Sequence, residues 1–173
     1  LKTLLINRNL GKDQQLNERM TSIMQNIFDA PDLKFGFTIY DDEDGTFKSM
    51  DLKQVKSYIL GDMLHSNCEN AVCQGTINSI VHEREYFAIP DVETYEENSG
   101  GNKLCDNLKQ NGMRSCILAP VAKNGKLLGV LELVSTKKNS LNGLNARKID
   151  DILPFIYTAA ERNLSDYQNY VKA

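Results

Sequence analysis

Two apolar runs within residues 115–134 are separated by the dipeptide Asn124-Gly125. Such a pair between apolar runs predicts a β-hairpin with a type I′ turn, because that turn needs positive φ at both central residues. Strict alternation of side chains then gives a register that pairs Val121 with Leu128, Ala119 with Val130 and Ile117 with Glu132. Both faces of the hairpin are apolar in this register. We therefore expect it to lie in the middle of a sheet that is covered on both sides.

The N-terminal part of the chain predicts a helix and a pair of strands. From residue 12 to residue 28 the apolar positions lie three or four residues apart, which predicts a helix that Pro31 ends. Residues 33–40 alternate apolar and polar side chains and predict a strand. Residues 46–50 can form its partner after a short acidic turn.

The middle of the chain predicts a mixture of helices, a strand and a loop. A capping-box pattern at residues 66–69 predicts a helix that extends to about Val81, and residues 85–89 predict a short strand. Residues 94–102 are acidic and glycine-rich and are typical of a mobile loop. Residues 103–110 predict one or two helical turns.

A long helical pattern begins at Asn145 and continues to Val171. Pro154 should kink this helix, because proline cannot donate the backbone hydrogen bond. Together the elements predict an α+β fold with a mostly antiparallel sheet of five or six strands flanked by helices. We expect the first and last helices to lie on one face of the sheet. Their apolar stripes fit packing on that sheet or pairing with a second copy of the chain, so a homodimer through these helices is one expectation.

Composition narrows the classes of partner. The chain has 173 residues and a net charge of −3, and so lacks the basic excess of nucleic-acid-binding proteins. No apolar run approaches the ~18 residues needed to cross a bilayer. We expect neither a nucleic acid nor a membrane as partner. The four cysteines lack zinc-ligand spacing, which is typical of reduced thiols in a cytoplasmic protein. The sequence begins at Leu1 rather than at Met, as a fragment of a longer protein would.

No metal or cofactor is expected from the motifs. The acidic turn at residues 41–45 lacks the twelve-residue calcium loop and its terminal glutamate, and is typical of a solvated turn. His65 and His82 are isolated and have no partner at metal-ligand spacing. No glycine-rich phosphate loop or Ser/His/Asp set is present.

The central hairpin also carries a family pattern, in the residues Ser115, Pro120-Val121, Asn124-Gly125, Gly129-Val130-Leu131 and Leu133. This pattern resembles the signature hairpin of GAF domains, which are small-molecule sensor and dimerisation modules of signalling proteins. The resemblance implies a GAF-like, PAS-related fold in which residues 12–173 form one domain with a long C-terminal helix. Residues 1–11 would be an extension or the end of an incoming linker helix. The function implied is regulatory rather than catalytic, with a pocket formed under residues 52–110.

Glu132 is the most informative polar residue, because a carboxylate on an apolar face is costly unless it is hydrogen-bonded or paired. It could contact an amine, amide or hydroxyl group of an unknown small-molecule ligand. Alternatively, a nearby Arg, Lys or backbone N–H satisfies it, or it reaches solvent. From Glu132 and the resemblance, the candidate ligand-binding residues are Phe37, Ile39, Phe87, Ile89, Asp91, Cys105, Ile117, Ala119, Val130 and Glu132.

Two alternatives to a ligand-binding sensor remain open. One is a structural dimerisation domain that has no ligand. The other rests on Val72-Cys73-Gln74-Gly75, Cys105-Asp106 and Ser115-Cys116, which partly resemble free methionine-(R)-sulfoxide reductases. That resemblance implies catalysis by a Cys105 thiolate with Cys73 as resolving thiol. Cys116 stands where those enzymes have Glu, and buried cysteine is also a common core residue.

Overall fold

The structure is a computed structural model that describes residues 18–43, 45–48, 76, 78–99, 103–154, 156–158, 161, 165 and 169. Most of the predicted helix between residues 66 and 81 lies outside this described part of the chain. Cys68 and Cys73 also lie outside it.

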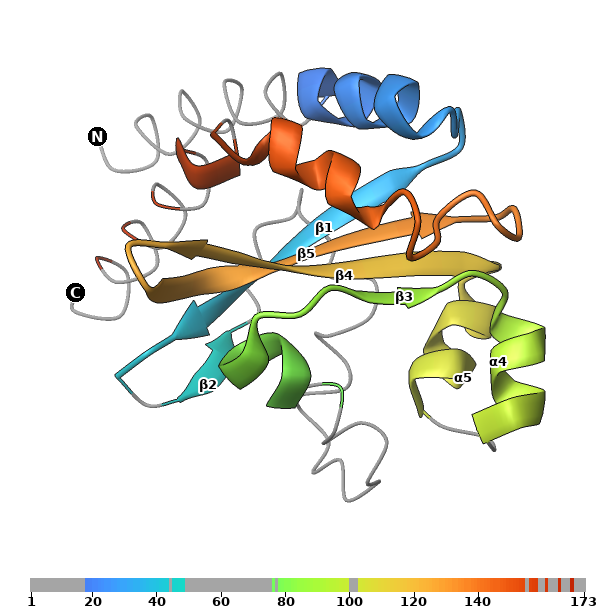
Figure 1. The fold of residues 1–173 in the computed structure, drawn as a ribbon, viewed down its shortest axis with the longest axis horizontal. Coiled ribbons are helices and arrows are strands. Elements are labelled where there is room, and N and C mark those ends of the chain that lie inside the picture. Colours follow the sequence, from blue (N-terminus) through green and yellow to red (C-terminus); the bar gives the residue numbers. More distant parts are fainter. Residues whose placement is uncertain are drawn as a thin grey trace, which may run out of the picture.

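Five described strands form one antiparallel sheet in the order β2-β1-β5-β4-β3 (Figure 1). Their bounds are β1 Lys34–Asp41, β2 Thr46–Lys48, β3 Phe87–Ile89, β4 Ser115–Lys123 and β5 Lys126–Ser135. Asn124 and Gly125 have φ values of 53° and 76° and form the turn between β4 and β5. The predicted hairpin and its position inside the sheet are therefore confirmed.

The predicted register of the hairpin is wrong beyond the first pairs, because β5 contains a β-bulge. Ala122 pairs with Leu127, but Val121 pairs with Gly129, so Leu128 is an extra residue on β5. The shift places Ala119 opposite Leu131 instead of Val130. Alternation along a single strand cannot reveal a bulge, since the bulge changes only how the two strands match.

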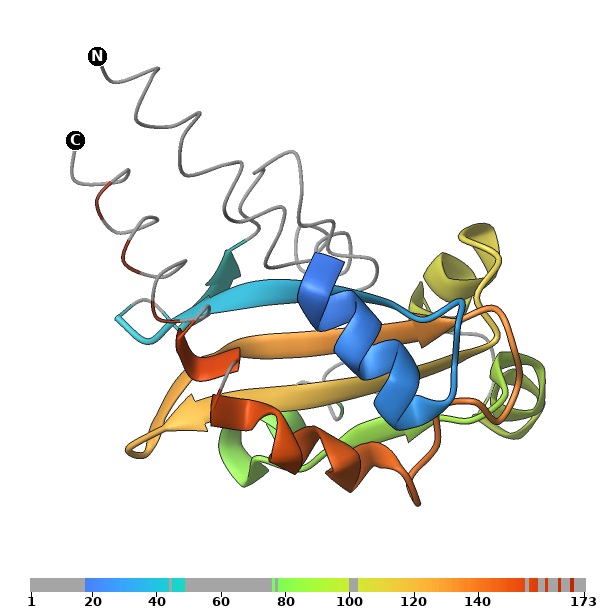
Figure 2. The same cartoon turned by 90° about the horizontal axis from the view of Figure 1, so that it is seen from above.

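One face of the sheet is covered by the helix over residues 18–28 and by segments from the C-terminal end of the chain (Figure 2). These segments are the 3₁₀ turn η2, Ala146–Asp151, and the helix that begins at residue 153. Met20, Met24 and Phe28 pack with Ile149, Ile152 and Ile156 in this cluster. The expectation that the first and last helices share a face is confirmed, and we call this the helix face.

The expected position of Pro154 inside a long helix is wrong. The helical residues begin at residue 153, after η2, so Pro154 lies in the first helical turn. Proline is tolerated there because the N–H that it lacks would have no partner within the helix. No kink at Pro154 is needed to explain the path of the chain.

The opposite face packs against α4, Val92–Ser99, α5, Lys103–Gln110, and the π-helical turn η1, Ser79–Glu83 (Figure 1). Helix α4 shows that the predicted mobile loop is wrong over residues 94–99. The Asp91 carboxylate accepts hydrogen bonds from the Glu93 backbone N–H and the Thr94 hydroxyl, and Val92 is fully buried. A capping aspartate and one buried anchor therefore make this acidic stretch helical.

The close approach of β5 to β1 at Gly129 yields a stability prediction. A Cβ at Gly129 would lie within 3.0 Å of the Thr38 carbonyl oxygen and of the Phe37 ring. Because a backbone carbonyl cannot move aside cheaply, Gly129→Ala should lower the free energy of unfolding by about 2–3 kcal/mol. Urea denaturation measures this difference. Gly143→Ala is the matched control, since a Cβ there meets no atom within 4 Å, and an equal loss in both variants would contradict the packing explanation.

Candidate functional site

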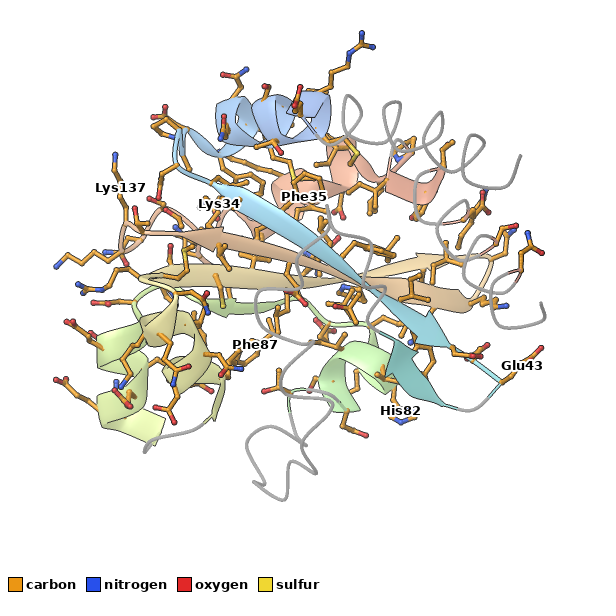
Figure 3. The ribbon with its side chains drawn as sticks, turned by 180° about the vertical axis from the view of Figure 1, so that it is seen from behind. Lys34, Phe35, Glu43, His82, Phe87 and Lys137 are labelled. Carbon is orange, nitrogen blue, oxygen red and sulfur yellow. The ribbon has the colours of Figure 1, made fainter. Side chains whose placement is uncertain are left out.

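The face of the sheet that packs against α4 and α5 carries Glu132, and we call it the Glu132 face. Leu118 lies opposite Glu132 on β4, and Phe87 lies opposite Leu118 on β3. On the other side, Thr38 of β1 lies opposite Val130. Because directly opposed residues point to the same side of a sheet, these side chains share this face. Figure 3 shows Phe87 on the side of α4, α5 and η1, with Phe35 on the opposite side, towards the helix face.

The structure brings together about half of the residues predicted for the ligand site. Phe87, Ile89, Val130 and Glu132 share the Glu132 face, and Cys105 of α5 packs into the same cluster. Asp91 follows β3 and lies at the edge of this group. The prediction that all ten candidates share one site is wrong, because the remaining four point into the helix-face cluster: Phe37, Ile39, Ile117 and Ala119.

The bulge and the pairing of β1 explain this correction. The bulge turns Ile117 and Ala119 away from Glu132, since Leu118 is the residue that lies opposite it. On β1, Phe37 pairs with Leu131 and Ile39 pairs with Gly129, which are both helix-face residues. A register without the bulge therefore placed Ile117 and Ala119 on the face of Glu132, and the sequence alone could not show which face of β1 meets that face.

Glu132 is fully buried, with 0% of its surface exposed, in the middle of β5. The Thr38 hydroxyl donates to its Oε1 atom at 2.9 Å. A buried carboxylate is costly, and this hydrogen bond offsets part of that cost. Thr38 was missed from the sequence because it stands between Phe37 and Ile39 and reads as the polar side of an alternating strand. Its partner could be found only once the pairing of β1 with β5 was known.

Two described cysteines, Cys105 and Cys116, pack on the Glu132 face, where both are fully buried and neither forms a disulfide. Burial is the main cause that raises the pKa of the Cys116 thiol well above its ordinary value, and the charge of Glu132 raises it further. Cys116 is therefore neutral near pH 7 and a poor nucleophile, since the thiolate is the reactive form. Its environment is typical of a core residue.

Asp91 makes structural contacts in this fold. The Arg114 guanidinium donates from Nη2 to Asp91 Oδ1 at 3.0 Å and to Glu93 Oε2 at 3.0 Å. The hydrogen bond from Arg114 is the main cause that lowers the pKa of Asp91. These bonds connect the start of α4 to the start of β4. A ligand contact by Asp91 stays a prediction.

Within the described residues, no three His, Cys, Asp or Glu side chains are grouped in a way that could hold a metal ion. No helix in the same part of the chain is both long and apolar enough to pass through a membrane.

Comparisons with known proteins show the family and the fold. A sequence model of the GAF domain matches residues 15–146, which is more than half of the chain. No curated protein matches this sequence. Among solved structures, a domain described as part of a two-component sensor histidine kinase protein from Sinorhizobium meliloti 1021 is 11% identical, with a TM-score of 0.57. That similarity covers 91% of this chain and 97% of the other.

Two further solved structures are similar over most of their length. GAF3 from Slr1393 of Synechocystis sp. PCC6803, in its photoproduct state, is 17% identical with a TM-score of 0.51 and covers 92% of this chain and 97% of that one. The type II free methionine-R-sulfoxide reductase from Thermoplasma acidophilum is 14% identical with a TM-score of 0.48 and covers 85% and 92%. At these identities the first structure and GAF3 show that the fold is shared but do not show a shared function. The reductase has a lower TM-score, and we conclude nothing from it.

The hydrogen bond between Thr38 and Glu132 gives a testable prediction. Thr38→Val keeps the shape of the side chain but removes one donor to a buried carboxylate, and should cost about 1–3 kcal/mol of unfolding free energy. Thr38→Ser retains the hydroxyl and should recover most of that loss. Chemical denaturation of the three proteins measures both effects. If the serine variant were as unstable as the valine variant, the hydroxyl would not be what stabilises Glu132.

Proposed function

This chain belongs to the GAF domain family, and on that premise we propose that it is a regulatory sensor module. In this proposal a small molecule binds at the Glu132 face, and its binding changes the arrangement of the helix that begins at residue 153. The ligand carries an amine, amide or hydroxyl donor for the Glu132 carboxylate. Phe87, Ile89 and Val130 supply apolar contacts, and Thr38 holds the carboxylate in position.

The observation that carries the proposal is the placement of one carboxylate at the centre of an apolar sheet face. Leu118, Val130 and Phe87, which lie near Glu132 in the ladder, have apolar side chains, and the Thr38 hydroxyl donates to the carboxylate. Most ligand sites are apolar surfaces with few polar groups that fix orientation. Replacing Glu132 by a neutral isostere of equal size therefore tests recognition with little change in packing.

Native mass spectrometry of the freshly purified full chain tests the sensor proposal. We expect the parent protein to retain a bound small molecule and Glu132→Gln to lose it. Loss of a hydrogen bond to a charged group should weaken binding by about tenfold or more. Glu97→Gln makes the same chemical change on the exposed side of α4 and should retain the ligand. Equal occupancy in both variants, or a parent protein that carries no ligand, would contradict the proposal.

A second function is favoured by one exposed apolar residue. Ile23 is 42% exposed on the helix over residues 18–28, while its neighbours Met20 and Met24 are buried against the sheet. We therefore propose that this helix uses the flank carrying Ile23 to pair with a second copy of the chain. The partly buried Ile27 lies beside it on the same flank and would extend the contact.

A charge on this flank should prevent association. Ile23→Asp should shift a concentration-dependent dimer to monomer, because an interface does not readily bury an unpaired carboxylate. Sedimentation velocity over a range of protein concentrations measures the shift. Ser22→Asp adds the same charge one residue away, on a solvent-exposed position, and serves as the control. Ile156 is only 2% exposed and belongs to the core, so a charge there would test folding instead. An Ile23→Asp protein that stayed dimeric would rule out this interface.

A further inference from the structure

The segment around β3 contacts both layers of the protein. Phe87 and Ile89 point to the Glu132 face, whereas Tyr86 and Ala88 pack against the helix-face cluster. Among the described strands, β3 is the last in the sheet order and has three residues. A short strand that is paired along one side has few ladder hydrogen bonds to hold it in place. Like β2, the other three-residue edge strand, it can therefore shift more easily than the long strands β1, β4 and β5.

On the helix face, Tyr86 is fixed to the turn that leads into the C-terminal helix. Its hydroxyl donates to Asp150 Oδ1 at 2.5 Å, and the Arg147 guanidinium lies 5.4 Å from the centre of its ring. Both partners belong to η2, Ala146–Asp151, which immediately precedes that helix. Burial is the main cause that raises the pKa of Tyr86, and Asp150 raises it further. The hydroxyl is therefore a protonated donor near neutral pH.

On the Glu132 face, Phe87 stands in contact with the proposed ligand site. It lies opposite Leu118, which in turn lies opposite Glu132. Its ring also meets the Tyr95 ring of α4 edge to face, with centroids 6.1 Å apart. A change in how α4 or a ligand packs on Phe87 therefore acts on β3, and the residue just before β3, Tyr86, contacts η2.

We propose that Tyr86 couples the Glu132 face to the C-terminal helix by making or releasing its hydrogen bond to Asp150 as β3 shifts. A ligand that packs against Phe87 favours one position of β3. That position determines whether the hydrogen bond from Tyr86 to Asp150 in η2 is formed or broken. The inference rests on the proposed function in one respect: it assumes that a ligand at the Glu132 face is what shifts β3. The coupling itself is a property of the chain and can be measured without a ligand.

Other contacts hold the C-terminal helix without involving the Glu132 face. Lys123, at the end of β4, forms an ion pair with Glu161 at 3.0 Å. Lys148 donates to the Ile27 carbonyl oxygen at 3.2 Å. These contacts join the helix-face elements to one another and to the hairpin turn. Removing one of these contacts provides a control, because it weakens the attachment of the same helix without changing β3.

Hydrogen exchange of the full chain in a double-mutant cycle tests the coupling. Phe87→Leu disturbs the Glu132 face, and we expect it to speed hydrogen exchange of the amides at 156–158 by about two- to tenfold. This is the change expected when one hydrogen bond, here the bond from Tyr86 to Asp150, is lost. In the Tyr86→Phe background, where the ring remains but the hydroxyl is absent, Phe87→Leu should add nothing at those amides. In the Lys123→Gln background the effect of Phe87→Leu should persist in full.

Each contrary result has a clear meaning. If Phe87→Leu leaves residues 156–158 unchanged, or acts equally with and without the Tyr86 hydroxyl, the coupling is overturned. If Phe87→Leu fails to fold, Phe87→Met makes the same test with a side chain of similar volume. A parent protein without a retained ligand would remove the sensor proposal, while a positive cycle would leave the coupling standing. The two proposals can therefore fail separately.

Discussion

Gly129 lies where β5 passes so close to β1 that there is no room for a side chain between the two strands. Next to it, Leu128 is the extra residue of the bulge, and both face the cluster that contains Val121. From Gly129 onward, every residue of β5 faces the side opposite to the one that strict alternation along the hairpin would give. The bulge places Glu132 opposite Leu118, and the register of β1 with β5 places Val130 opposite Thr38. The composition of both sheet faces follows from these two pairings.

A sheet that is covered on both faces requires its polar side chains to find partners inside the protein. Ser115 and Ser135 are buried at strand ends, where Ser115 donates to the Lys137 carbonyl and Ser135 donates to Asp32. These partners belong to adjacent polar loops, so both serines are ordinary polar contacts at strand ends. The pair formed by Thr38 and Glu132 differs, because it lies in the middle of the sheet, where the residues opposite its members on the described strands include the apolar Val130 and Leu118. That position distinguishes a candidate recognition group from an ordinary polar contact at a strand end.

The two layers have different roles in this picture. The helix face is a continuous apolar core that joins the first helix, the sheet and the C-terminal helix. The Glu132 face combines apolar residues with a carboxylate and two buried thiols. In the proposed sensor, a signal from the second layer must cross the sheet to reach the first. Among the described strands, β3 offers a route because consecutive residues, Tyr86 and Phe87, touch different layers.

The sequence alone determined the elements whose signals are local. Asn124-Gly125 specified the hairpin turn because only a few residue types accept positive φ at both positions. The helical stripe of Met20, Met24 and Phe28 specified which side of that helix is buried. The tertiary structure decided which strand faces meet, because a bulge and the pairing of β1 with β5 depend on contacts between distant residues. Ile117 and Ala119 therefore lie on the helix face, and Thr38 contacts Glu132. Alternation shows which residues of one strand share a side, but it does not show which sides of neighbouring strands lie together.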